Sequence, residues 1–110
     1  MEAHATNDPV LDALDQLIAD TLDDPGRAVM TISRVIATTR LAREQNIPRR
    51  RARHLVDRAR DEQIRSAMHA AGLAVSAEEV ERKGVREWIA EHWDLIQQIA
   101  SVIISIVVLL

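Results

Sequence analysis

Four arginines within five residues form the densest chemical feature of this 110-residue chain. Arg49, Arg50, Arg51 and Arg53 stand in the segment 41–59, which reads LAREQNIPRRRARHLVDRA. A guanidinium group stays charged and carries a rigid fork of N–H donors, which fits a phosphate group or the edge of a guanine base. The four side chains are therefore candidate contacts to nucleic acid or to anionic lipid head groups.

This segment resembles a helix-turn-helix motif over residues 41–59. The resemblance rests on apolar and turn positions, which are Leu41, Ala42, Asn46, Ile47 and Leu55. It implies that the second helix enters the major groove, where the four arginines at its N-terminal end would meet the bases. Two positions depart from the pattern, because Gln45 replaces an apolar residue and Ala52 is small. The alternative is an arginine-rich face that pairs with the acidic N-terminal segment or with another chain.

The net charge of −3 conceals a segregation into three blocks. Residues 1–26 hold seven acids and no base. Residues 27–60 hold ten arginines and two acids, and residues 61–94 hold eight acids and four bases, which gives −7, +8 and −4 in turn. This pattern predicts that the acidic first segment folds back on the basic middle, or that each block meets its own partner.

The remaining titratable residues do not predict catalysis. The four histidines are not spaced to chelate a metal together, and the chain has no cysteine. Three isolated glycines make no phosphate-binding loop, and no serine or carboxylate pair stands in a catalytic context. We expect no catalytic residues, no metal site, no cofactor and no small-molecule substrate, so the protein is predicted not to be an enzyme.

The last sixteen residues, 95–110, are uncharged, and eleven of them are Leu, Ile or Val. As a helix they would reach about 24 Å, slightly short of a bilayer core of about 30 Å. Trp88 and Trp93 would lie at the membrane interface, and the bases behind them would place the N-terminal region in the cytoplasm. The sequence therefore favours a membrane-associated protein with a tail anchor, ahead of a cytoplasmic soluble protein. Burial of the tail in an oligomer, and last in a monomer core, are the alternatives.

Polar residues within the tail predict helix contacts. Gln97, Ser101 and Ser105 are spaced by four residues, so they share one helical face, and Ser101 and Ser105 form a small-xxx-small pair. Together with Trp88 and Trp93 they are the candidate membrane or oligomer contacts, and a homo-oligomer is the predicted state. The alternative is that the serines bond to their own helix backbone.

We expect an all-α fold of three short amphipathic helices and a long C-terminal helix that ends in the apolar segment. The predicted divisions are a leader at 1–8, a helical domain at 9–74, a connector helix at 76–94 and the apolar segment at 95–110. Within the domain, helices are expected over 9–23, 27–45 and 48–71, with Gly72 as the C-cap of the third. A capping box at Ser76 and Glu79 opens the fourth, which has no clear stop, since Gly84 weakens a helix by only about 1 kcal/mol. If continuous, this helix would be about 50 Å long and its end would project.

These observations predict a small non-enzymatic adaptor or scaffold, of the kind seen among phage or bacterial accessory proteins. It would anchor in a membrane or self-assemble through its apolar C-terminal helix. The alternative is a soluble, oligomeric helix-turn-helix DNA-binding protein that uses the tail for assembly.

Overall fold

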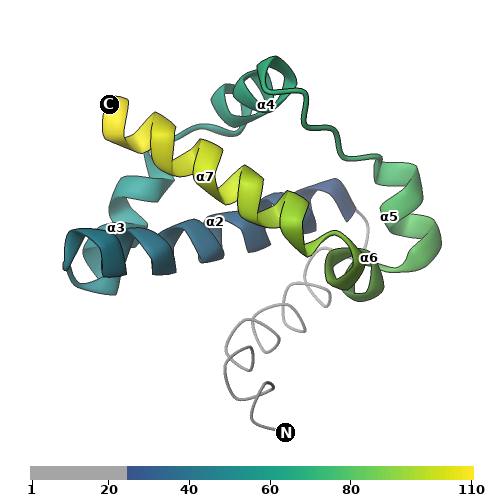
Figure 1. The fold of residues 1–110 in the computed structure, drawn as a ribbon, viewed down its shortest axis with the longest axis horizontal. Helices are drawn as coiled ribbons and strands as arrows, with labels where there is room; N and C mark the ends of the chain where they lie inside the picture. The colour runs from purple at the N-terminus through teal and green to yellow at the C-terminus, as the bar shows by residue number, and fades with distance from the viewer. Residues whose placement is uncertain (1–24) are drawn as a thin grey trace, which may run out of the picture.

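The structure, a computed structural model, describes residues 25–110, which form six α-helices and no strand (Figure 1). The helices are α2 (Pro25–Gln45), α3 (Arg49–Asp57), α4 (Asp61–Ala70), α5 (Ala77–Lys83), α6 (Val85–Glu91) and α7 (Trp93–Leu109). The all-α prediction is confirmed. The predicted leader and the helix expected over 9–23 lie outside the described residues.

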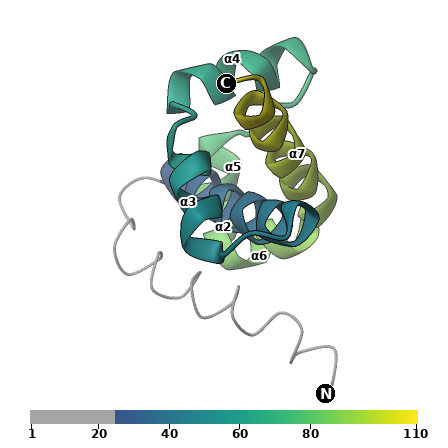
Figure 2. The same cartoon turned by 90° about the vertical axis from the view of Figure 1, so that its left-hand side faces the viewer.

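The centre of the fold is the packing of α7 on α2. These two helices cross in the ribbon views, with α3 at one end and α4 above (Figures 1 and 2). α2 buries five large apolar residues, and α7 buries four large ones and an alanine: Val29, Met30, Ile32, Ile36, Leu41, Ile96, Ile99, Ala100, Ile103 and Val107. Each fully buried isoleucine contributes about 1.5–3 kcal/mol of transfer free energy. The apolar tail is therefore part of the described core.

This packing corrects the prediction that the tail projects. The projection is expected for a continuous helix of about 50 Å, whereas the breaks at Gly84 and His92 leave α7 with 17 residues. α2 alone offers a buried row, and its small residues Ala28, Ser33 and Ala37 are fully covered, which lets neighbours approach closely. The Ser33 hydroxyl donates to the carbonyl oxygen of Val29 at 2.9 Å, so its burial leaves no unmet hydrogen bond.

The helix expected over 48–71 is two helices. The backbone leaves the helical conformation at Arg60, whose ψ is 153°, and the buried Ala59 lies in the joint between α3 and α4. The Gln63 side chain then accepts a hydrogen bond from the Arg60 N–H at 2.8 Å and starts α4. Gly72, with φ of 75°, ends α4 as predicted, because the Leu73 N–H bonds to the Met68 carbonyl at 2.9 Å in a Schellman pattern.

The helix expected to start after Ser76 is interrupted twice. Its beginning agrees with the prediction, since Ser76 Oγ accepts from the Glu79 N–H at 3.2 Å. Gly84 ends α5 with φ of 93° and ψ of 139°, a conformation that side-chain-bearing residues rarely adopt. At His92, α6 and α7 meet with a bend of 86°. Trp88 and Ile89, which lie between the two breaks, are buried in the core.

Within residues 25–110, none of the individual helices combines the length and the apolar composition that crossing a membrane requires. The bent pair α6 and α7 meets both criteria when taken together, by length and composition alone.

Candidate nucleic-acid interface

The turn between α2 and α3 is built by local sequence chemistry. Asn46 adopts a left-handed conformation with φ of 53°, which asparagine tolerates better than most residues. The Ile47 N–H donates to the Ala42 carbonyl at 3.0 Å, which closes a Schellman motif at the end of α2. Pro48, with φ of −60° and ψ of 146°, then turns the chain into α3. The predicted turn is therefore present at the predicted residues.

The apolar residues of α3 pack into the core, so the side of the helix that faces solvent is polar. Ala52 and Val56 are fully buried, and Leu55 packs partly against the same core. Ala52, small for a helix-turn-helix position, is fully covered by its neighbours, so no larger side chain is needed there to fill the site. The outer face carries the side chains of Arg50, Arg51, Arg53, His54, Asp57 and Arg58, all exposed. In this respect the helix resembles a basic recognition helix.

Arg34 fixes the far end of α3. Its two Nη atoms donate to the carbonyl oxygens of Val56 at 2.9 Å and Ala59 at 2.6 Å. The second Nη also reaches Asp61 Oδ1 at 2.7 Å, at the start of α4. The Arg34 side chain is only 19% exposed. A single guanidinium therefore adds hydrogen bonds to two carbonyls at the end of α3, of which that of Val56 also accepts from the Ala59 N–H at 3.1 Å, and it joins α2, α3 and α4.

Sequence reasoning missed Arg34, although one signal was present. Arg34 is the only charged residue in the stretch 28–39, which is otherwise apolar, serine or threonine. A lone charge on such a stretch is retained in the folded state only where it has hydrogen-bond partners. Its partners lie 22 to 27 residues away, so their identity depends on the fold.

The four predicted arginines do not behave alike. Arg49 Nη1 donates to Thr39 Oγ1 at 2.6 Å, so this side chain folds back onto α2. Arg53 lies 4.0 Å from Asp57, at the limit of an ion pair. Arg50 and Arg51 form no hydrogen bond or ion pair with any residue of 25–110. The most available guanidinium groups are therefore those of Arg50 and Arg51.

The N-terminal end of α3 adds a second attraction for anions. Its N-cap is Pro48, which makes no side-chain capping bond, and the first turn contains no acid. The first amide N–H groups of a helix carry partial positive charge and bind phosphate readily. Here the amides of residues 49–51 lie in the same first turn as the available arginines Arg50 and Arg51, so both attractions act at one end of the helix.

The polar residues of α7 lie on its outer side. Ser101 and Ser105 are exposed, and Gln97 is half-buried. The Ser101 hydroxyl donates to the Gln97 carbonyl at 3.1 Å, and Arg40 Nη1 donates to Ser101 Oγ at 3.0 Å. Arg40 also reaches the Gln97 carbonyl at 3.3 Å. Ser101 and the Gln97 backbone thus have partners within the described chain, whereas Ser105 faces outward.

The two tryptophans lie in different surroundings. Trp88 is 1% exposed and belongs to the core, and Trp93 is half-buried in a shallow groove that Arg40 and Gln97 also line. Trp88 stacks on His92 with ring centroids 4.3 Å apart, and its indole N–H donates to Glu79 Oε1 at 3.1 Å. That hydrogen bond lowers the pKa of Glu79 below its ordinary value of 4.5.

An ion pair crosses the corner between α5 and α6. Lys83 Nζ donates to Glu91 Oε1, and this bond raises the pKa of Lys83 above its ordinary value of 10.5. Lys83 and Glu91 thus each have a partner of opposite charge. No group of three or more metal-ligating residues converges anywhere in residues 25–110. The α3 surface therefore remains the part of the described chain with the clearest binding chemistry.

Comparisons with family models, with curated proteins and with solved structures each matched nothing to this chain.

Proposed function

We propose that this protein is a non-enzymatic nucleic-acid-binding protein that grips duplex DNA through α3. The observation that carries the proposal is the exposed arginine row on a short helix whose inner face and far end are both fixed. Arg50 and Arg51 supply free guanidinium forks, and Arg34 holds the helix that bears them. Arginines on a fixed helix lose little side-chain and backbone freedom on binding a phosphate, which favours affinity.

The dimensions of α3 support duplex binding. An α-helix with its side chains is about 10–12 Å across, and the DNA major groove is about 12 Å wide, so the exposed side of α3 can enter it. The turn at Asn46 sets α3 at an angle to α2, so its N-terminal end can approach a groove first, as in helix-turn-helix proteins. Contacts from the N-terminal amides and from Arg50 and Arg51 would be to phosphates, which give affinity without sequence preference.

The composition of the outer face favours DNA over a lipid surface. A helix that lies on a membrane inserts an apolar face between the head groups. The apolar residues of α3, Ala52, Leu55 and Val56, are turned into the protein core. The exposed side chains of α3 are charged or imidazole, which suits phosphates lining a groove.

A gel shift with random duplex at about 50 mM salt tests this proposal. The full chain should bind, and Arg50→Gln/Arg51→Gln should weaken binding about ten- to hundredfold through the loss of two phosphate contacts. The control Arg65→Gln/Arg82→Gln removes the same charge from exposed arginines of α4 and α5 and should bind nearly as well as the unchanged protein. No shift by the unchanged protein at low salt, or equal loss in both variants, would contradict the proposal.

A second candidate function is self-assembly or membrane attachment through the C-terminal end. It is favoured by one observation: Val108, Leu109 and Leu110 are 66%, 86% and 57% exposed. Exposed large apolar residues gathered at one place mark interaction surfaces. Because the preceding turns of α7 are in the core, the proper test leaves them intact.

That test compares the full chain with Val108→Ser/Leu109→Ser. Sedimentation equilibrium and flotation with vesicles of phosphatidylcholine and phosphatidylglycerol report the two forms of association. Oligomers or vesicle binding that the double variant loses would support this candidate. A chain that is monomeric at every concentration and stays with the aqueous phase would count against it.

A further inference from the structure

The charge of the chain is divided at the start of α2. Residues 1–24 carry seven acids and no base, and the chain as a whole is −3, so residues 25–110 carry +4 from fourteen bases and ten acids. This excess is concentrated around α3, because residues 27–60 alone sum to +8. A polyanionic segment and a polycationic surface therefore belong to one molecule.

Two arginines without a partner in residues 25–110, Arg50 and Arg51, stand next to each other on α3, whereas Arg43, Arg65 and Arg82 stand singly on α2, α4 and α5. Arg34, Arg60 and Lys83 each have an acidic partner elsewhere in residues 25–110. Arg50 and Arg51 have none in that range, and the contact of Arg53 with Asp57 is at 4.0 Å. Carboxylates on another segment would find two adjacent available guanidinium groups here.

The acidic segment is tethered within reach of this surface. It joins α2 at Pro25, and Arg34, nine residues further along, contacts the carbonyls of Val56 and Ala59. Nine helical residues cover about 14 Å, and Thr39, which Arg49 contacts at the N-terminal end of α3, lies fourteen residues or about 21 Å along α2 from the junction. The seventeen residues 8–24 would extend about 25 Å even as a helix, which exceeds the gap.

We propose that the acidic N-terminal segment, residues 8–24, lies on the α3 arginine surface in the free protein and competes with DNA for it. Only the competition with DNA rests on the proposed function, since the contact between the segment and α3 does not require DNA binding. Asp12, Asp15, Asp20 and Asp23 supply carboxylates that replace DNA phosphates as acceptors for the α3 guanidinium groups. DNA then binds only the fraction of molecules in which the segment is displaced, which weakens the apparent affinity by that fraction.

One other place near the junction could receive the segment. A groove beside Gly26 is lined by apolar residues of α2, α4 and the following loop, with Arg65 and His69 among its walls. It would hold the apolar side of an amphipathic segment. We favour the α3 surface because the six negative charges of residues 8–24 demand more than the two titratable groups of this groove, and the experiment distinguishes the two places.

The first arm of the experiment needs no DNA. The chain has no cysteine, so Gln16→Cys places a single nitroxide label in the segment of the full-length protein. NMR signals of the Arg50 and Arg51 side-chain Nε–H groups should broaden at low salt and recover at about 0.5 M salt, where surface charges are screened. Unbroadened α3 signals, or broadening confined to residues around Val29 and Leu73, would overturn the proposal.

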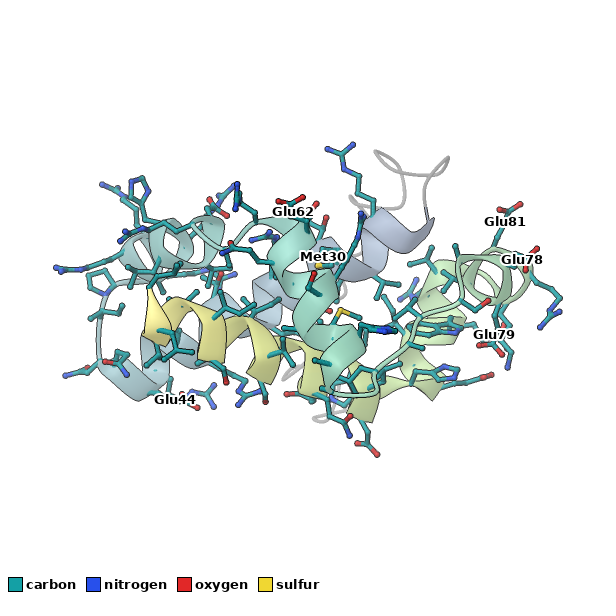
Figure 3. All side chains as sticks on the ribbon, turned by 90° about the horizontal axis from the view of Figure 1, so that it is seen from above. Met30, Glu44, Glu62, Glu78, Glu79 and Glu81 are labelled. Carbon is teal, nitrogen blue, oxygen red and sulfur yellow. The ribbon has the colours of Figure 1, made fainter. Side chains whose placement is uncertain are left out.

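The second arm measures competition by the full chain. Asp12→Asn/Asp15→Asn/Asp20→Asn/Asp23→Asn should bind random duplex about tenfold more tightly at low salt, as expected if about a tenth of the molecules are open. The matched control changes net charge equally at the α5–α7 corner, through Glu78→Gln/Glu81→Gln/Glu87→Gln/Asp94→Asn. Figure 3 places Glu78 and Glu81 at the end of the molecule away from Glu44, which precedes α3.

The outcomes of the two arms separate the proposals. Equal tightening by both quadruple variants would mean that net charge alone acts, and the competition would be rejected. The α3 signals could broaden while neither the unchanged protein nor the N-terminal quadruple variant binds duplex. This result would support the intramolecular contact and reject the proposed function. Broadening together with tighter binding only in the N-terminal variant is the result expected here.

Discussion

Replacing Arg34 by methionine removes the guanidinium that joins three helices while keeping an unbranched side chain. The change deletes two charge-assisted bonds to the carbonyls of Val56 and Ala59 and one to Asp61. Each carbonyl bond contributes about 1 kcal/mol or slightly more. The pair with the half-exposed Asp61 adds about 0–1 kcal/mol, because water screens it. The expected loss of stability is therefore about 2–3 kcal/mol.

Thermal unfolding followed by circular dichroism measures this loss. For a domain of this size about 2–3 kcal/mol lowers the Tm by about 10–20 °C. Arg43→Met is the matched control, because Arg43 is exposed on the same helix without a partner among residues 25–110, and it should change stability by less than about 0.5 kcal/mol. An equal Tm for the Arg34 and Arg43 variants would show that the Arg34 hydrogen bonds do not stabilise the end of α3. Arg34→Met should also weaken duplex binding by more than Arg43→Met does.

Three further changes test the fold and its response to acid. Gly84→Ala should destabilise by about 1–3 kcal/mol in urea unfolding, because alanine is strained at a φ of 93°; a gain in stability would instead indicate a continuous α5–α6 helix. Because its folded-state pKa lies below 4.5, Glu79 contributes stability above that pH and loses it as the pH falls through the folded value. The fluorescence of Trp88 should therefore change on acidification in the unchanged protein, and an identical change in Glu79→Gln would refute this assignment. Ile103→Ala should cost about 2–5 kcal/mol and the exposed Leu109→Ala almost nothing, and equal unfolding midpoints would contradict the burial of α7.

The sequence predicted the parts of the fold that local chemistry determines. The turn at Asn46 and Pro48 follows from the left-handed tolerance of asparagine and the rigidity of proline, and both residues have the expected conformations. Gly72 ends α4 for the same kind of reason. The exposed arginines of α3 could be predicted as well, because the apolar positions of that helix leave its other side polar.

The parts that could not be predicted depend on contacts between distant segments. The end of α3 depends on Arg34, whose partners at Val56 and Ala59 are adjacent only in the folded chain. At Gly84, the helix-propensity cost of about 1 kcal/mol gave no reason for a break, yet the bend allows Trp88 to be buried. Burial of an indole and its neighbours outweighs one helical hydrogen bond. The tail likewise could not be assigned to the core from sequence, because its packing against the apolar row of α2 joins segments that are far apart in the chain.

The most direct test of the central proposal is the salt dependence of duplex binding. Fluorescence anisotropy with a labelled random duplex at several salt concentrations gives the slope of log K against log salt, which counts the phosphate contacts at about 0.9 each. Arg50→Gln/Arg51→Gln should reduce the magnitude of this slope by about 2, and Arg65→Gln/Arg82→Gln should leave it unchanged. A slope that is the same in both double variants would show that the α3 arginines do not contact DNA.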